Sequence, residues 1–159
     1  MPSVPDVARP QPAALAAAQP GGLAGLDPGR SKCGLVLTDA ERRRIGQALV
    51  LPPLDALAQL QRWHQQQQLV AVVLGDGTGS ARWQQQLSPL LPVWMIDERG
   101  TTLAARQRYW QLEPVRGWRR LVPSGLRQPP RDWDDVVAQL LLERWLGYPL
   151  LRDPAVRRR

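Results

Sequence analysis

Two apolar runs near the start of the chain are separated by a tight connection. Residues 23–27 are apolar up to a closing aspartate, Pro28-Gly29 interrupts the run, and residues 33–38 resume it. This spacing is typical of two neighbouring strands joined by a short turn. A third strand is predicted around residues 45–51, although a charged stretch before it and two prolines after it leave its bounds weak.

The pattern then changes to the period of a helix. Apolar side chains recur every three residues from Leu54 to Trp63, which predicts an amphipathic helix over about residues 53–65. The Val-rich run 69–74 and the short run 93–96 have no polar positions, as expected for strands that are buried on both faces. Strands of this kind belong to parallel sheets that helices cover.

Three more helices are predicted along the rest of the chain. One runs through Trp83 and stops at Pro92, one begins near Thr102, and the last begins at Asp132 as its N-cap and extends through Trp145. Three strands followed by alternating helices and strands predict an α/β fold. We expect a mixed five-stranded sheet flanked by helices.

The amino-acid composition limits the kinds of partner and of metal site that the chain can have. The 159 residues carry a formal net charge of +7, almost wholly from arginine, which favours a polyanionic partner such as nucleic acid. A single cysteine and a single histidine exclude a zinc cluster built from these residues. Any metal site would therefore use carboxylates, which favours Mg²⁺ or Mn²⁺.

The chain divides into three predicted parts. Residues 1–22, rich in Pro, Ala and Gly, are expected to be a disordered tail, residues 23–148 a single domain, and residues 149–159 a basic tail. An insertion rich in Arg and Pro occupies residues 112–131 of the domain. No run of 18 apolar residues and no signal peptide are found, so we expect a cytoplasmic protein without a membrane span.

Acidic residues follow the predicted strands and open the last helix. Asp27 lies in the motif Asp-x-Gly-x-x-Lys-x-Gly at a strand-to-strand turn, and Glu98 follows a buried strand. Asp134 and Asp135 fall in the first turn of the last helix. Ligands gather at the carboxyl ends of strands in α/β sheets, so these acids could converge. The alternatives are an ordinary Asp-x-Gly turn and acids that merely complement the helix dipole.

Converging carboxylates need a counter-charge. Three of them in one site would repel one another and raise at least one pKa unless divalent metal neutralised them. One or two ions of Mg²⁺ or Mn²⁺ are therefore predicted, and a pair of ions would suit an in-line phosphodiester displacement.

The order of motifs resembles the YqgF/RuvX family of RuvC-like proteins. The matching segments are Gly25-Leu26-Asp27-Pro28-Gly29-Arg30 with Lys32 and Gly34, then Leu74-Gly75-Asp76-Gly77-Thr78, then Asp97-Glu98-Arg99-Gly100-Thr101-Thr102, and finally residues 134–146. The resemblance covers about residues 23–146. The insertion is longer than in most members and resembles a version seen in photosynthetic bacteria.

The resemblance implies an RNase H-like fold and a nuclease. Its metal-binding and catalytic acids would be Asp27, Glu98 and Asp134, with Asp135 as a fourth acid or a substitute. The implied substrates are precursor 16S rRNA and the Holliday junction. The chain departs from the family at Lys32-Cys33-Gly34 and Gly75-Asp76-Gly77, which changes the loops that would face phosphate.

Basic side chains beside the acids and in the insertion are candidates for contacts with nucleic acid. They are Arg30, Lys32, Arg99, Arg116, Trp118, Arg119, Arg120, Arg127 and Arg131. Guanidinium groups beside an aromatic ring suit phosphates and stacked bases. The alternative for the insertion is a solvated proline-rich loop packed by its tryptophan.

Two other functions compete with a nuclease. The chain could be a nucleic-acid-binding module of the same fold without turnover. Asp-x-Gly also opens the nucleotide-binding domains of sugar kinases and actin-like ATPases, but those folds duplicate the domain and need far more chain. A homodimer would suit a junction that needs two symmetric cuts, whereas an enzyme that trims RNA can act as a monomer.

Overall fold

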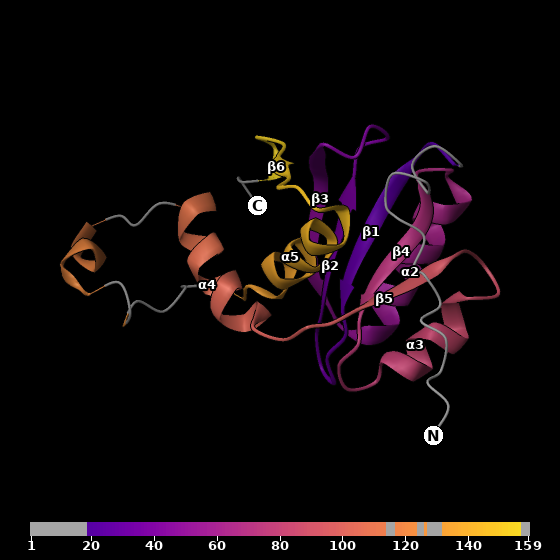
Figure 1. Ribbon diagram of the computed structural model, residues 1–159, viewed down its shortest axis with the longest axis horizontal. Helices are drawn as coiled ribbons and strands as arrows, with labels where there is room; N and C mark the ends of the chain where they lie inside the picture. Colours follow the sequence, from indigo (N-terminus) through magenta and orange to yellow (C-terminus); the bar gives the residue numbers. More distant parts are fainter. Residues whose placement is uncertain (1–18, 114–116, 124–125, 127–131, 157–159) are drawn as a thin grey trace, which may run out of the picture.

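The computed structural model describes residues 19–113, 117–123, 126 and 132–156 (Figure 1). The strands are β1 (Gly22–Asp27), β2 (Cys33–Thr38), β3 (Arg44–Leu51), β4 (Leu69–Gly75), β5 (Val93–Ile96) and β6 (Leu151–Arg152). The helices are α2 (Pro53–Gln65), α3 (Ser80–Leu87), α4 (Thr101–Leu112) and α5 (Asp134–Leu146), with a 3₁₀ helix η1 (Gly117–Leu121). The five predicted strands, which correspond to β1 to β5, and the predicted helix at residues 53–65 are confirmed.

The strands form one mixed sheet in the order β5-β4-β1-β2-β3-β6. β1, β2 and β3 run antiparallel, as a short turn requires, while β4 and β5 are parallel to β1 after helical crossovers. The predicted α/β fold with a mixed sheet is confirmed. The predicted count of five strands is wrong, because β6 adds a sixth strand parallel to β3.

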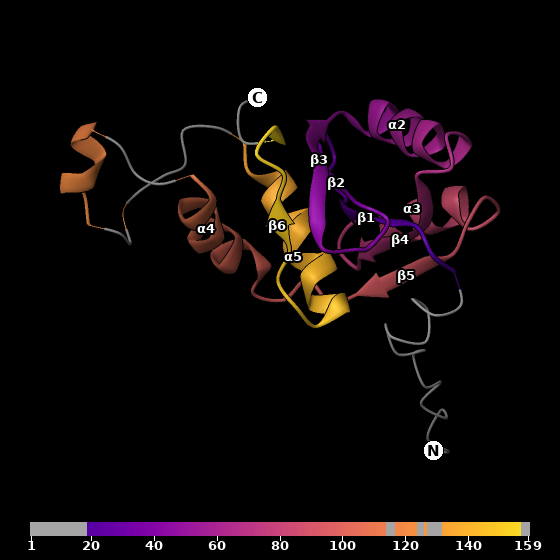
Figure 2. The same ribbon diagram turned by 90° about the horizontal axis from the view of Figure 1, so that it is seen from above.

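Helices cover both faces of the sheet (Figures 1 and 2). Alternate side chains of each strand point to opposite faces, so the sheet builds two cores. One core lies under α4 and α5 and includes the buried ring of Tyr109, and the other lies under α2 and α3 and includes Trp63. Both rings are 1% exposed. The domain is thus a three-layer sandwich with β1 at its centre.

Two helix boundaries differ from the prediction. α5 begins at Asp134 and no side chain caps it, because Asp132 instead forms an ion pair with Lys32. α3 ends at Leu87, short of the predicted stop at Pro92, and a turn fills the gap.

The ends of the domain also need correction. Gly22 already belongs to β1, and residues 1–18 of the predicted tail lie outside the described residues. The segment predicted as a basic tail from residue 149 contains β6, the buried Leu150 and the buried Arg152. These residues are part of the fold because apolar packing and a buried ion pair attach them to α5.

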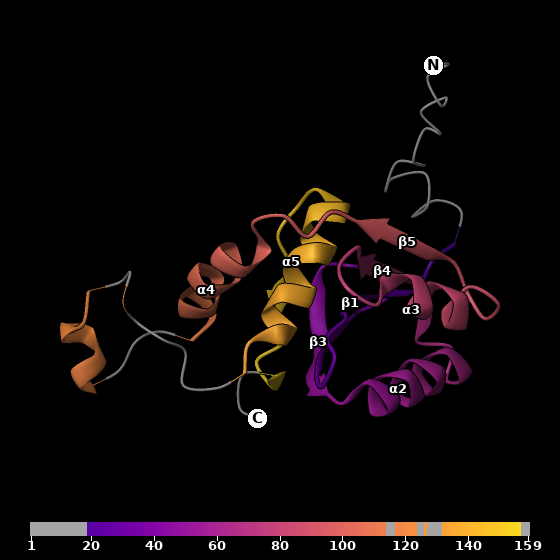
Figure 3. The same ribbon diagram turned by 90° about the horizontal axis from the view of Figure 1, so that it is seen from below.

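The predicted insertion contains the 3₁₀ helix η1, which lies beyond α4, away from the sheet (Figures 1 and 3). Arg116, Arg127 and Arg131 lie outside the described residues. Among the residues that are described, no helix is long and apolar enough to cross a membrane.

Candidate active site

Asp27 ends the central strand, where it is partly buried. Its neighbour Leu26 pairs with Leu74 of the parallel β4, and Asp27 itself pairs with Gly34 of β2. Burial, and then the nearby carboxylates of Glu98 and Asp134, raise the pKa of Asp27 to about 7. The fold therefore brings Glu98 and Asp134 within electrostatic reach of Asp27.

The Glu98 carboxylate lies in a cradle formed by the backbone of two glycines, Gly75 and Gly77, which leave room for it in this position. A Cβ added at Gly75 or at Gly77 would collide with this carboxylate. Burial raises the pKa of Glu98, and Asp76 and Asp97 add to the rise, while a hydrogen bond from the Gly77 backbone N–H opposes it. Its Oε1 is buried without a hydrogen-bond partner within the described part of the chain. A buried carboxylate oxygen without a donor is suited to a cation.

Backbone contacts fix the turn that carries Glu98. The Glu98 N–H donates to Asp76 Oδ1 at 3.1 Å, and its carbonyl accepts from Thr101 Oγ1 at 2.6 Å. Arg144 of α5 donates to the carbonyl oxygens of Asp97 and Arg99, at 2.7 and 3.0 Å. The Glu98 side chain therefore extends from a held position into the site.

The sequence interpretation assigned no role to Asp76 or Arg144, and it treated Gly75-Asp76-Gly77 mainly as a turn. The signal that could have found the cradle is the pair of glycines flanking an acid directly after a buried strand. Nothing in the sequence pattern distinguishes Arg144 from the many other arginines of the chain.

Asp134 reaches the site because the start of α5 packs directly on β2. A Cβ at Gly34 would overlap the backbone of Asp134, so glycine is required for this close approach. Burial raises the pKa of Asp134, with Asp132 and Asp135 adding to the rise and Lys32 opposing it. The last glycine of the Asp-x-Gly-x-x-Lys-x-Gly motif therefore positions the third acid.

Asp135 is not brought into this cluster. Its Oδ2 pairs with Arg152 Nη1 at 3.0 Å, and the two side chains are only 4% and 3% exposed. The prediction that Asp135 is a fourth metal ligand is corrected, because a helix turns successive side chains to different directions and this one faces β6.

The candidate nucleic-acid contacts are spread over two regions. Arg30 and Lys32 belong to the β1–β2 turn beside Asp27, and Lys32 Nζ pairs with Asp132 Oδ2 at 2.6 Å. The exposed Arg99 lies 3.7 Å from the Asp97 carboxylate. Trp118 and Arg120 are exposed on η1, which Figure 1 shows apart from the strand ends. Arg119 belongs to the same 3₁₀ helix.

The acids meet the requirements of a hard cation only in part. All their donor atoms are oxygen, which suits Mg²⁺ or Mn²⁺, and Oε1 of Glu98 is available. No group of three or more His, Cys, Asp or Glu side chains in the described ranges lies close enough together to hold a metal ion. The donor chemistry of Asp27, Glu98 and Asp134 thus suits such an ion, but their spacing would hold one only if these side chains moved closer together or substrate oxygens completed the coordination.

Comparisons with known proteins find similar solved structures. A T. thermophilus RuvC in complex with Holliday junction substrate is 16% identical and has a TM-score of 0.42, with 80% of this chain and 94% of that chain covered. A second T. thermophilus RuvC structure is 15% identical, with a TM-score of 0.40 and coverage of 79% and 95%.

A ROK hexokinase from Thermus thermophilus is 15% identical with a TM-score of 0.37, over 56% of this chain and 37% of that chain. No protein-family model and no curated protein matches the sequence. The strand order agrees with the RNase H-like fold that the resemblance implies. Membership of the YqgF/RuvX family stays a prediction, and the case for the chemistry rests on the residues themselves.

Proposed function

We propose that the protein is a metal-dependent endonuclease that hydrolyses phosphodiester bonds in structured nucleic acid, either branched DNA such as a Holliday junction or precursor 16S rRNA. The observation that carries the proposal is that Asp27, at the end of the central strand, is partly buried and has its pKa raised to about 7, with the carboxylates of Glu98 and Asp134 adding to the effect of burial. The raised pKa values of all three acids mean that the folded protein holds negative charge there without enough counter-charge of its own. A divalent cation would supply that charge.

Each acid has a distinct part in this proposal. Asp27 would be the central ligand, since both other acids act on its pKa, and Glu98 would present its Oε1 from the glycine cradle. Asp134 would approach from α5, and Arg30 and Lys32 of the adjoining turn would contact phosphate. A bound Mg²⁺ or Mn²⁺ would activate water and stabilise charge on the leaving oxygen.

Cleavage by the purified protein tests the proposal. Four-way junctions and RNA containing the 16S precursor end would be incubated with Mg²⁺ or Mn²⁺, and Asp27→Asn should lower the rate by at least ~100-fold while the circular dichroism spectrum is retained. Asp55→Asn, at an exposed aspartate of α2, is the matched control and should cut at the parent rate. If Asp27→Asn cuts as well as the parent, the site assignment is wrong.

A second candidate is a nucleic-acid-binding module without turnover. The absence of a closed group of three ligands among the described side chains favours it. This reading expects salt-dependent binding of nucleic acid with no heat of Mg²⁺ or Mn²⁺ binding in calorimetry. Metal binding that Asp27→Asn and Glu98→Gln both abolish would decide for the nuclease, and light scattering would show whether a homodimer is present.

A further inference from the structure

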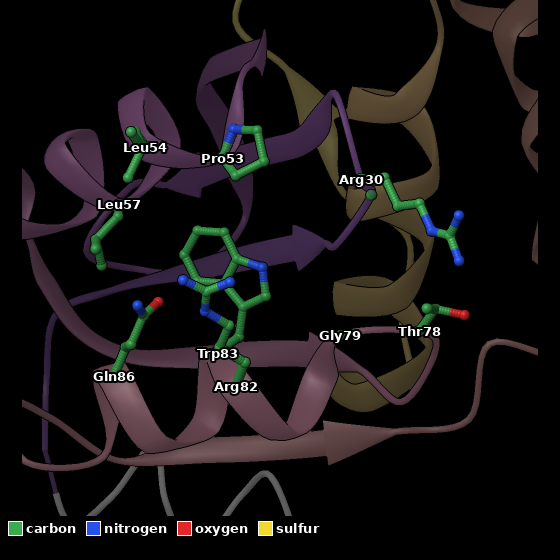
Figure 4. Close-up of a pocket in the computed structure, with 10 residues that line it drawn as sticks. Arg30, Pro53, Leu54, Leu57, Thr78, Gly79, Arg82, Trp83 and Gln86 are labelled. Atoms are coloured by element: carbon green, nitrogen blue, oxygen red, sulfur yellow. The ribbon is translucent and has the colours of Figure 1, made fainter.

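A pocket of about 480 Å³ opens beside the acids, on the face of the sheet that α2 and α3 cover (Figure 4). Its volume lies within the range of roughly 300 to 1,000 Å³ that is usual for small-molecule sites. Its walls come from the start of α2, from α3 and from two loops. The volume is ample for one nucleobase with its sugar.

The apolar part of the pocket combines the exposed Leu54 with the largely buried Trp83, which is 7% exposed. Leu54 is 80% exposed at the start of α2, and Leu57 lines the wall one turn further on. The indole of Trp83 forms the wall on α3 (Figure 4). An aromatic ring beside aliphatic side chains is a surface on which a base of any sequence can pack.

The charged part of the pocket is wholly cationic. Arg82 lies on α3 beside Trp83, and Arg30 extends from the β1–β2 turn at the other end of the pocket, away from Leu57 (Figure 4). No carboxylate is among the residues that line it. Neither arginine belongs to an ion pair in the part of the chain that the structure describes. The guanidinium of Arg30 points away from Trp83 (Figure 4), so Arg82 is the arginine next to the apolar wall, and both groups are suited to phosphates of a strand that crosses the pocket.

Both loops that line the pocket also carry residues of the candidate active site or of its glycine cradle. Gly29 and Arg30 follow Asp27 in the β1–β2 turn. Thr78 and Gly79 likewise follow Gly77, whose backbone holds Glu98. A strand with one nucleotide in the pocket would therefore present a neighbouring phosphate to the acids.

We propose that this pocket binds an unpaired nucleotide of a nucleic-acid strand, with its base against Trp83 and Leu54 and its phosphates at Arg82 and Arg30. The inference rests on the proposed nuclease function and sharpens it. The preferred substrate carries unpaired nucleotides next to the phosphodiester bond that is cut, as at a flap, an overhang or an opened branch point. A fully paired duplex cannot fill the pocket, because its bases are stacked inside the helix.

Binding without metal isolates the pocket from catalysis. Short single strands of DNA and of RNA, each carrying one 2-aminopurine, would be titrated with protein in the presence of a chelator. The parent should quench the fluorescence as the base packs on Trp83. Leu54→Glu and Arg82→Gln should each weaken binding about tenfold, since base packing and a phosphate contact are removed. Both side chains lie at the surface, so the fold should be retained.

Matched substitutions far from the pocket serve as controls. Arg62→Gln removes the same charge from the last turn of α2, and Leu151→Glu introduces the same acid on the exposed side of β6. Both should bind as the parent does. If the pocket variants bind no more weakly than these controls, or if a blunt duplex binds as tightly as the single strands, the proposal is overturned.

The two proposals fail in different ways. Asp27→Asn should bind the single strands as the parent does, because the acid lies outside the pocket lining. Loss of cleavage with retained binding supports both proposals. If the protein never cuts but its binding still depends on the pocket residues, the nuclease proposal is rejected and the pocket proposal is retained. Tighter binding of DNA or of RNA strands would show whether the pocket prefers deoxyribose or ribose.

Discussion

Two neighbouring aspartates at the start of α5 have opposite surroundings. Asp134 faces the end of the central strand, where Asp27 and Glu98 also lie and where burial is met by too few cations. Asp135 faces β6, where it pairs with Arg152. One region holds uncompensated charge and the other holds a matched ion pair, although one peptide bond separates the two side chains.

The paired region extends along α5 and holds β6 and Leu150 against this helix. Arg152 Nε donates to Gln139 Oε1 at 2.8 Å, and Gln139 Nε2 donates to the Leu150 carbonyl at 3.2 Å. Further along, Arg108 of α4 pairs with Glu143 at 3.1 Å. A buried charge contributes to the stability of a fold only when its partner is also present. A buried charge without a partner is instead a candidate site for binding a ligand. The comparison therefore separates the acids that hold the fold together from the candidate functional ones.

The largest expected effect comes from breaking the paired region. Arg152→Met should lower the free energy of unfolding by about 3 to 5 kcal/mol, because Asp135 would stay buried without its counter-charge. Urea unfolding would measure this loss. The double variant Asp135→Leu with Arg152→Met should recover most of it, since apolar side chains can replace a buried ion pair. A loss below about 1 kcal/mol for the single variant would show that the pair is not structural.

In the uncompensated region, removal of a charge should raise the free energy of unfolding instead of lowering it. The folded protein holds the Asp27 proton up to a pKa of about 7, whereas the unfolded chain releases it near 3.8, so stability falls as the pH rises between these values. Asp27→Asn removes this loss and should stabilise the protein by about 2 to 4 kcal/mol at pH 8.

Thermal unfolding of parent and variant from pH 4 to pH 8 would measure this difference, with Asp55→Asn as the exposed control. The curves of parent and Asp27→Asn should converge toward pH 4. A constant difference across the range would contradict the raised pKa of Asp27.

The smallest effect on stability should come from the cradle of Glu98. Gly77→Ala places a methyl group on the carboxylate, which can swing away because it ends a flexible side chain, so unfolding should change by less than about 1 kcal/mol. Cleavage should fall roughly tenfold to a hundredfold, since a displaced ligand no longer matches the reacting geometry.

Gly46→Ala on β3 is the control for this substitution. Its added methyl group would lie 3.9 Å from the nearest atom and should leave both stability and cleavage unchanged. Equal cleavage by Gly77→Ala and Gly46→Ala would show that the position of Glu98 does not matter.

Local sequence patterns predicted the elements that depend on local physics. The runs of apolar residues placed β1, β2, β4 and β5, because a strand that is buried on both faces must be apolar throughout. β6 was missed because two residues carry no period, and its pairing with β3 depends on the buried contacts of Leu150 and Arg152. Asp132 was taken for a cap because its ion pair with Lys32, 100 positions away, leaves no local signal.

The sequence by itself determined which residues can do chemistry here: a carboxylate after each of two strand ends, two more at a helix start, and a surplus of arginine. Only the tertiary structure decided which of them meet. The approach of α5 to Gly34 delivers Asp134 to the strand ends, and β6 withdraws Asp135. Side chains next to each other on a helix point in different directions, so their functions depend on packing partners that local sequence does not encode.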